Sequence, residues 1–355
     1  MHRILVINPG STSTKIAVYE DDCLIFEEVI RYRPEELGVF ETVLGQYKKR
    51  IEDIFEILAR QDCQISDFTA IIGRGGLLRP IESGVYEVNA KMISDLIGTG
   101  KIPHACNLGA PMAREIADII GVPAFIADPP VVDEFDPLAR LSGLPEISRT
   151  AVFHALNHKA VARRAAKAIG IRYEDANFVV CHMGSGATIG AHRKGRVIDA
   201  NHALDGEGPF TPERSGGLPL LGFVEMCYSG NLSLEEIKKK LVGRGGLMAY
   251  LGTNSAVEVE RRIAEGDEYA ALVYEAMAYQ IAKEIGSQAT VLKGEVDAII
   301  LTGGVCYSEM LVEWIKARVK FIAPVMVYPG EDEMQALAEA CLRALRREEE
   351  VKIYM

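Results

Sequence analysis

The sequence lacks the features that mark membrane, secreted or nucleic-acid-binding proteins. Its 355 residues contain no apolar run near the roughly 18 residues that span a bilayer. Only four consecutive apolar residues precede Asn8, fewer than the core of a signal peptide contains. Basic residues are in deficit, 39 against 50 acidic ones, for a formal net charge of −11. That balance argues against a partner with a phosphate backbone.

Cysteine patterning is also missing. The seven cysteines are scattered and include no CxxC pair, so they indicate neither a disulfide framework nor a zinc site. We interpret them as small buried hydrophobic side chains. Hydrophobic residues make up 48% of the chain and charged residues 25%, which is typical of a globular protein with a large core. The sequence therefore predicts a cytoplasmic protein without membrane or nucleic-acid partners.

Short β-branched runs alternate with helical patterns, which predicts an α/β protein. The expected strands cover 4–7, 15–19, 70–72, 178–181, a run from 187, 196–199, 296–301 and 324–328. The expected helices cover 35–60, 108–120, 148–169, 233–241, 268–292 and 331–347.

Each half of the chain begins with a strand, a turn of small residues and a second strand. This is a repeat of architecture and not of sequence. The length suggests about two domains, and no proline- or glycine-rich linker separates the halves. We expect domains at 1–149 and 150–330, with the last helix, within 331–355, packing back on the first domain. A cleft is expected between them.

Three turns of small residues follow expected strands, over 8–15, 182–188 and 301–305. Glycine lets backbone N–H groups approach an anion, and serine and threonine add hydroxyl donors. One such turn fits an ordinary hairpin, but three in a two-part α/β chain predict phosphate binding. The common alternatives fail, because the chain has no GxxxxGK[ST], no protein-kinase motif set, and GxGxxxG in place of the dinucleotide fingerprint.

These turns carry a resemblance to a known superfamily. NPGSTSTK (8–15), HMGSGAT (182–188) and LTGGV (301–305) resemble the two phosphate motifs and the adenosine motif of the superfamily that contains acetate kinase, sugar kinases, actin and heat-shock chaperone ATPases. Further stretches resemble the acetokinase family, and within it the butyrate kinase branch more closely than the acetate kinases. They are IIGRGG (71–76), PHACNLGAP (103–111), VFHALNH (152–158), GEGPFTPERSGG (206–217) and YPGEDEMQALAEA (328–340).

The resemblance implies an actin-like ATPase fold, with two duplicated ribonuclease-H-like cores and ATP in the cleft between them. It also implies reversible transfer of the γ-phosphoryl group of ATP, bound with Mg²⁺, to butyrate, giving butyryl phosphate and ADP. A carboxylate is ionised at neutral pH and needs no general base, so catalysis depends on positioning and charge stabilisation. Relatives are dimers or larger assemblies, which implies a homo-oligomer.

Arginines and histidines supply the candidate cationic donors. Arg74 and Arg214 each lie in a glycine-containing turn, where a planar guanidinium can bind carboxylate or phosphate oxygens bidentately. The resemblance aligns Arg74 with a substrate-side arginine and Arg214 with a transition-state arginine. It aligns His154 with a histidine that stabilises the transferring phosphoryl group and His104 with a cleft histidine that contacts substrate. His182 heads the second phosphate turn.

The remaining candidates would hold phosphates or the metal. Asn8 ends the first strand, and its amide suits a phosphate or a metal-bound water. Asp128 and Glu333 are the candidate carboxylates for Mg²⁺, which needs only one or two, and the resemblance gives Asp128 a catalytic role as well. Neighbouring carboxylates remain open as metal ligands: Asp133, Asp136, Glu331 and Asp332. The other residues expected to bind ATP are Ser11, Ser13, Lys15, Gly184, Ser185, Gly186, Gly303 and Gly304.

Two alternatives stay open. One is a kinase for another short or branched acid, such as acetate, propionate or isobutyrate, because one methylene changes binding by only about 1–3 kcal/mol. The other is an actin-like module that couples ATP to a protein partner, although the paired arginine turns favour a small anionic substrate. A sugar kinase is less consistent, because no family motif supplies the aspartate base that a neutral hydroxyl requires.

Overall fold

A computed structural model of the chain describes residues 1–40, 42–98, 105–204 and 206–355. It contains two compact units, residues 1–132 with 332–355 and residues 133–331. The sequence places the boundary between 149 and 150, whereas the structure assigns residues 133–149 to the second unit. The reason is local bonding, since Asp136 N donates to Ile198 O and Arg149 pairs with Asp199 and Glu207.

The first unit is built on a seven-stranded mixed sheet with the order β12-β5-β6-β4-β1-β2-β3. Its strands are β1 (Arg3–Pro9), β2 (Ser13–Glu20), β3 (Cys23–Arg31), β4 (Ala70–Arg74), β5 (Val85–Glu87), β6 (Ala124–Ala127) and β12 (Lys352–Ile353). Its helices are α1 (Pro34–Gly38), α2 (Tyr47–Arg60), α3 (Ala90–Gly98), α4 (Gly109–Ile120) and α12 (Glu333–Leu345).

The second unit has a five-stranded sheet with the order β11-β10-β7-β8-β9. Its strands are β7 (Asn177–Met183), β8 (Ala187–Arg193), β9 (Arg196–Ala200), β10 (Ala298–Gly303) and β11 (Val325–Pro329). Its helices are α5 (Ala155–Ala168), α6 (Leu220–Tyr228), α7 (Leu234–Leu241), α8 (Gly246–Leu251), α9 (Ala256–Ala264), α10 (Glu268–Val291) and α11 (Glu309–Val319).

The two sheets repeat one topology. In the first unit, β1, β2 and β3 form an antiparallel meander, and β4 and then β6 add in parallel on the other side of β1. In the second, β7, β8 and β9 form the meander, and β10 and then β11 add in parallel beside β7. The expected duplication is therefore present at the level of strand order, and the turns over 8–15 and 182–188 each join the first two strands of one meander.

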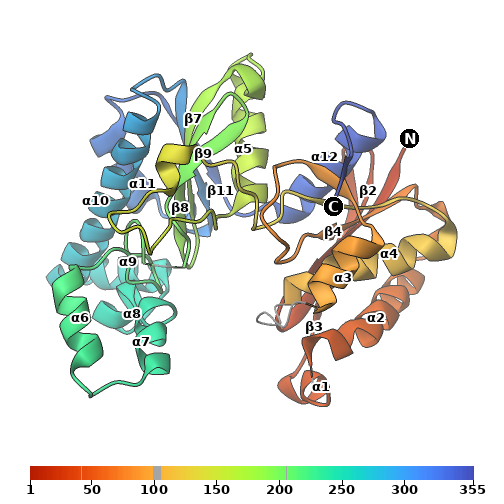
Figure 1. Ribbon diagram of the computed structural model, residues 1–355, viewed down its shortest axis with the longest axis horizontal. Coiled ribbons are helices and arrows are strands. Elements are labelled where there is room, and N and C mark those ends of the chain that lie inside the picture. Colours follow the sequence, from red (N-terminus) through yellow and green to blue (C-terminus); the bar gives the residue numbers. More distant parts are fainter. Residues whose placement is uncertain (41, 99–104, 205) are drawn as a thin grey trace. The chain divides into compact units, whose positions relative to one another are not determined.

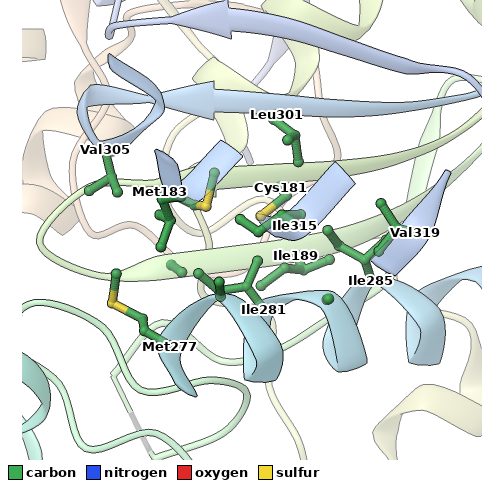
Figure 2. Close-up of a cluster of buried hydrophobic side chains, with 14 of the residues drawn as sticks. Cys181, Met183, Ile189, Met277, Ile281, Ile285, Leu301, Val305, Ile315 and Val319 are labelled. Atoms are coloured by element: carbon green, nitrogen blue, oxygen red, sulfur yellow. The ribbon is translucent and has the colours of Figure 1, made fainter. Parts of the chain in front are cut away.

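Side chains alternate along the strands of the second unit, so one face of the sheet is apolar and the other carries polar side chains beside a second apolar cluster. Cys181 and Met183 of β7 pack with Ile189 of β8 against Met277 and Ile281 of α10, and α11 covers the same face (Figure 2). Helix α5 lies on the opposite side of the sheet (Figure 1). Because successive strand side chains alternate, the polar residues of β7 and β8 face α5.

Two expected helices differ from those observed. The pattern over 35–60 contains α1, a 3₁₀ turn over Val43–Gln46 and α2, because Gly38 and Gly45 interrupt a continuous helix. The helix expected over 148–169 begins only at Ala155. The preceding segment is held by other contacts, since Arg149 donates to Ala139 O and Ala200 O and Val152 O accepts from Ala203 N.

Among the described helices, none combines the length and apolar character that crossing a bilayer requires.

Candidate functional site

Charged side chains gather where strands β1 and β4 of the first unit end. Asn8 and Arg74 lie on the α12 face of these adjacent parallel strands, and Glu333 is the first residue of α12. Arg74 binds Glu333 fork to fork, with Nη1 3.0 Å from Oε2 and Nη2 2.9 Å from Oε1. Asn8 Nδ2 donates to Glu333 Oε2 at 2.7 Å, and its Oδ1 accepts from Arg74 at 3.3 Å. The structure therefore brings together three of the expected site residues.

Glycines allow the close packing behind this cluster. A Cβ at Gly73 would lie 2.2 Å from Gly109 O, so strand β4 touches the first turn of α4. A Cβ at Gly76 would lie 2.6 Å from Asn107 Oδ1. The glycines around Arg74 thus fix the path of its turn against α4.

The first turn of small residues follows Asn8 and is held from behind by an arginine. Gly10 N donates to Ser13 O, and the fully buried Arg50 donates to the carbonyls of Gly10 and Ser13 at 3.0 and 2.9 Å. Arg50 also donates to Ser11 O and Thr14 Oγ1, and its guanidinium lies 4.8 Å from the ring centroid of Tyr32. Burial lowers the pKa of Arg50.

Sequence analysis missed Arg50. It lies in the basic run 48–50 of an amphipathic helix, and nothing in its spacing separates it from a solvated charge. Its donors occupy the carbonyl oxygens of the turn, which leaves the hydroxyl-bearing side of the turn to face outward. Ser11 is exposed and Ser13 half-buried. Lys15 is the register partner of Asn8 across β1 and β2, and its ammonium lies 3.4 Å from Glu27 Oε1.

The remaining candidate carboxylates have structural partners. Asp128 follows β6, is 3% exposed and has a φ of 39°. Its Oδ1 accepts from Ser83 Oγ at 2.6 Å and Gly84 N at 2.9 Å, which fixes the turn before β5. Asp133 pairs bidentately with Arg140, and Asp136 pairs with Arg193, both within the second unit. His104 lies outside the described residues.

The second turn of small residues, in the other unit, joins β7 to β8 and contacts Arg214. Gly184 N donates to Gly186 O at 2.8 Å. Thr211 Oγ1 and Glu213 N both donate to Ser185 O, which fastens the loop that carries Arg214 to this turn. A Cβ at Gly186 would lie 1.8 Å from Arg214 Nη1, so the guanidinium rests directly on this glycine. Burial lowers the pKa of Arg214.

Two histidine rings lie against each other, tilted, at the base of this turn. The ring centroids of His154 and His182 are 4.2 Å apart, with an interplanar angle of 33°. His182 is 1% exposed, and within the described ranges neither ring nitrogen makes a hydrogen bond, although Nε2 lies 3.2 Å from Glu331 Oε1. His154 Nδ1 contacts Thr188 Oγ1 at 2.9 Å. The candidates His154, at the start of α5, and His182, at the end of β7, therefore meet on the α5 face of the sheet, beside Thr188 of β8.

The third turn of small residues follows β10 beside this second turn. Gly303 has a φ of 99°, and a Cβ there would lie 2.2 Å from Met183 O, so only glycine fits. A Cβ at Gly304 would meet no atom within 4 Å. The backbone at Gly304 is therefore open to a flat ligand such as an adenine ring.

The donor set suits a hard cation that keeps most of its water. Among the residues that the structure describes, no group of three or more histidine, cysteine, aspartate or glutamate side chains is placed to hold a metal ion. Glu333 and Asn8 lie next to each other, with Asn8 Nδ2 donating to Glu333 Oε2 and both Asn8 Oδ1 and Glu333 Oε2 accepting from Arg74, so a cation here would take the place of Arg74 at these oxygens. Mg²⁺ prefers oxygen ligands and binds through one or two carboxylates together with substrate phosphates, so this pair fits it.

Comparison with known proteins assigns the chain to a family. An acetokinase family model matches residues 146–326, about half of the chain. The fold is similar to that of an acetate kinase from Porphyromonas gingivalis, with a TM-score of 0.81 and 18% identity over 96% of this chain and 99% of that one. A propionate kinase from Francisella tularensis gives 0.75 and 21% over 96% and 99%, and an acetate kinase from Entamoeba histolytica 0.74 and 15% over 94% and 97%. The chain belongs to the acetokinase family.

Proposed function

We propose that this protein is a carboxylate kinase that transfers the γ-phosphoryl group of ATP to a short-chain fatty acid, with butyrate as the preferred acid. A carboxylate oxygen of the acid attacks the γ-phosphorus in line, the bond to the β,γ-bridging oxygen breaks, and ADP leaves with those electrons. No proton moves, because the attacking carboxylate is already ionised. The acyl phosphate retains the phosphoryl group, and the reaction runs in both directions.

The contact of Arg214 with Gly186 carries this proposal. It places a guanidinium against a glycine turn whose base holds His154 and His182. Negative charge develops on the transferred phosphoryl oxygens, and donors fixed before the reaction stabilise it most effectively. We assign Arg214 and His154 to that charge, and the turns over 8–15 and 182–188 to the phosphates.

The first unit supplies the acid-binding and metal-binding groups of the proposal. Arg74 is bound to a carboxylate in the structure, that of Glu333, in the bidentate geometry that a fatty-acid carboxylate would use. When Mg²⁺ is bound, Glu333 and Asn8 would hold it, with Asp128 as a further candidate ligand, and the cation would neutralise charge on the β- and γ-phosphates. Arg74 would then be free of Glu333 and could bind the carboxylate of the acid.

Substitution of Arg214 tests the assignment. In an assay that couples ADP release to a chromogenic reaction, Arg214→Ala should lower kcat by about 10²–10³-fold, as loss of one charge-stabilising donor does elsewhere. Arg244, which stands in a similar glycine-containing turn, is the matched control, and Arg244→Ala should retain kcat. Near wild-type turnover of Arg214→Ala would refute the role assigned to Arg214.

The preference for butyrate comes from the resemblance of the motifs to the butyrate kinase branch. Turnover should be compared over acetate, propionate, butyrate, isobutyrate and valerate. We expect kcat/KM to peak at butyrate. A peak at acetate or propionate would keep the carboxylate kinase and refute the butyrate preference.

The alternative of a nucleotide-switched binding module makes a different prediction. In that case, no carboxylate would stimulate ADP formation, and ADP release would depend on a protein partner. The residues around Arg74 and those around Arg214 favour the kinase, because each group presents a guanidinium suited to binding a small anion.

We further propose that the enzyme works as a cytoplasmic homo-oligomer. Helix α6 supports self-association, because Leu220, Leu221 and Tyr228 are 76%, 82% and 88% exposed on one apolar helix. Single exposed apolar residues are common, whereas a contiguous apolar patch marks an interaction surface. Sedimentation should give a mass above 38.9 kDa, and Leu221→Glu should lower it towards the monomer.

A further inference from the structure

A row of buried polar side chains runs along the α5 face of β8. Thr188 and His192 point to this face, with Gly190 between them. The ring of His158, from α5, lies over Gly190, where a Cβ would come within 3.3 Å of its Nδ1. Thr188, His158 and His192 are each completely buried.

Four contacts join this row from end to end. His154 Nδ1 lies 2.9 Å from Thr188 Oγ1, which lies 2.9 Å from His158 Nε2. His158 Nδ1 lies 3.2 Å from His192 Nε2, and His192 Nδ1 lies 2.8 Å from the Tyr173 hydroxyl. The row therefore connects His154, the proposed hydrogen-bond donor to the phosphoryl group, to the hydroxyl of Tyr173.

Each of these four hydrogen bonds contains one proton, so the donor and acceptor in one bond determine the donor and acceptor in the next. Burial lowers the pKa values of His158 and His192 well below the usual range, so both rings are neutral and carry one N–H each. If one ring donates through Nε2, it must accept through Nδ1. The hydroxyl of Thr188 likewise donates to one histidine while it accepts from the other. The row thus has two states, with all donors pointing either towards His154 or away from it.

The surroundings of Tyr173 favour the first state. Lys159 Nζ and Arg163 Cζ lie 5.7 and 5.4 Å from the centroid of the Tyr173 ring, and both charges lower the pKa of His192 further. Lys159 is also paired with Glu134, so the carboxylate of Glu134 offsets part of the positive charge of Lys159. Cations stabilise the negative end of a row of aligned hydrogen-bond dipoles, and that end lies at Tyr173 when every donor points to His154.

We propose that this row fixes His154 as the tautomer protonated at Nε2 and unprotonated at Nδ1. Tyr173 donates to His192, His192 to His158, His158 to Thr188, and Thr188 to His154 Nδ1. The ring nitrogen of His154 that is not bonded to Thr188 then carries the proton, so it can donate to a phosphoryl oxygen. Placing a proton on Nδ1 would reverse all four hydrogen bonds. The functional half of this inference rests on the role proposed above for His154.

The tautomers are measurable without any reaction. The chain has only seven histidines, so long-range ¹H–¹⁵N correlation spectra of protein labelled in the histidine side chains will resolve them. Single His→Asn variants assign the signals. We expect His154, His158 and His192 each to show a protonated Nε2 and an unprotonated Nδ1. A protonated Nδ1 on His154, or averaged shifts from a mixture, would overturn the inference.

Variants then test whether the row matters for turnover. Thr188→Val keeps the shape of threonine and removes the hydroxyl, whereas Thr188→Ser keeps the hydroxyl. We expect Thr188→Val to lower kcat about 10–100-fold, as loss of a group that orients a histidine does elsewhere, with little change in the KM for ATP. The His154 signals should become those of a tautomer mixture. Thr188→Ser should restore both kcat and the single tautomer.

Tyr173→Phe removes the terminal donor and should also give mixed tautomers at His154. Equal kcat losses in Thr188→Val and Thr188→Ser, or an unchanged His154 tautomer in Tyr173→Phe, would refute the positioning role. Failure of the proposed function gives a different result. If His154→Ala retains turnover while the wild-type tautomers are those expected, the row is confirmed and the phosphoryl role of His154 is refuted.

Discussion

Gly186→Ala tests whether turnover depends on where the Arg214 guanidinium lies, because the variant displaces this group without removing it. A Cβ at residue 186 would lie 1.8 Å from Arg214 Nη1, 2.0 Å from Cζ and 2.6 Å from Nε, where ordinary contacts begin near 3.4 Å. The guanidinium must therefore shift by at least about 1.5 Å. Gly186 is not among the glycines with positive φ, so alanine is acceptable to the backbone. We therefore expect the flexible end of the Arg214 side chain to shift while the backbone of β7 and β8 stays in place.

The expected loss of kcat follows from this displacement of the guanidinium. A misplacement of about 1 Å can reduce a rate about 10²-fold, and complete loss of a charge-stabilising donor costs about 10²–10³-fold. We expect kcat of Gly186→Ala to fall by about 10²-fold in the coupled ADP-release assay, measured with the best acid of the series. The hydrogen bond from Arg214 to Ala203 O is lost as well, and the free energy of unfolding should fall by only about 1–3 kcal/mol.

A double-mutant cycle decides the cause. In an Arg214→Ala background the guanidinium is gone, so adding Gly186→Ala should change kcat by less than about threefold. Additive losses would mean that Gly186 acts independently of Arg214, by direct approach of the nucleotide to the turn. Near wild-type kcat in the single variant would refute the reasoning altogether.

The remaining predictions concern the first turn, the metal, the nucleotide and the core. Arg50→Lys leaves at least two of the five acceptors of Arg50 unpaired, and urea titration should show a loss of about 2–6 kcal/mol of unfolding free energy, together with a higher KM for ATP. Glu333→Gln should raise the Mg²⁺ concentration needed for half-maximal turnover, measured by titration at fixed ATP. Gly304→Val should raise the KM for ATP about tenfold or more with an unchanged Tm, because the site is sterically open in the free protein. Lys159→Met strands the buried carboxylate of Glu134 and should cost about 3–5 kcal/mol by chemical denaturation, part of which Lys159→Met/Glu134→Gln should recover.

Local patterns were enough to predict the elements that repeat between the units. The β1–β2 and β7–β8 hairpins lie where β-branched runs flank small residues, and the helix expected over 233–241 forms as α7, with a capping box between Ser233 and Glu236. The patterns failed where tertiary bonds decide the backbone. The helical periodicity of 148–154 is overridden by hydrogen bonds from Arg149 to the carbonyls of Ala139 and Ala200, which lie 10 and 51 residues away in the sequence.

Sequence motifs mark the turns that carry the candidate site residues, but they do not mark the residues that support those turns. Asn8 and Arg74 were identified from two separate motifs, and the parallel pairing of β1 and β4 explains why they meet. Arg50 carries no motif, because its function is to bind carbonyl oxygens, which every residue possesses. Only the fold shows that this arginine of α2 is buried behind the turn that follows Asn8.

The row of buried histidines is a second case in which the sequence does not show which residues act together. A TxGxH pattern over 188–192 places two polar side chains on one face of a strand, with a glycine between them, but their contacts depend on α5 packing on that face. His158 alone would be interpreted as a structural residue one turn beyond His154. Once its ring lies over Gly190 and bridges Thr188 to His192, its tautomer is tied to that of His154. Structural and functional histidines are then not separate classes here, because the buried ring sets the proton position of the one proposed to meet the phosphoryl group.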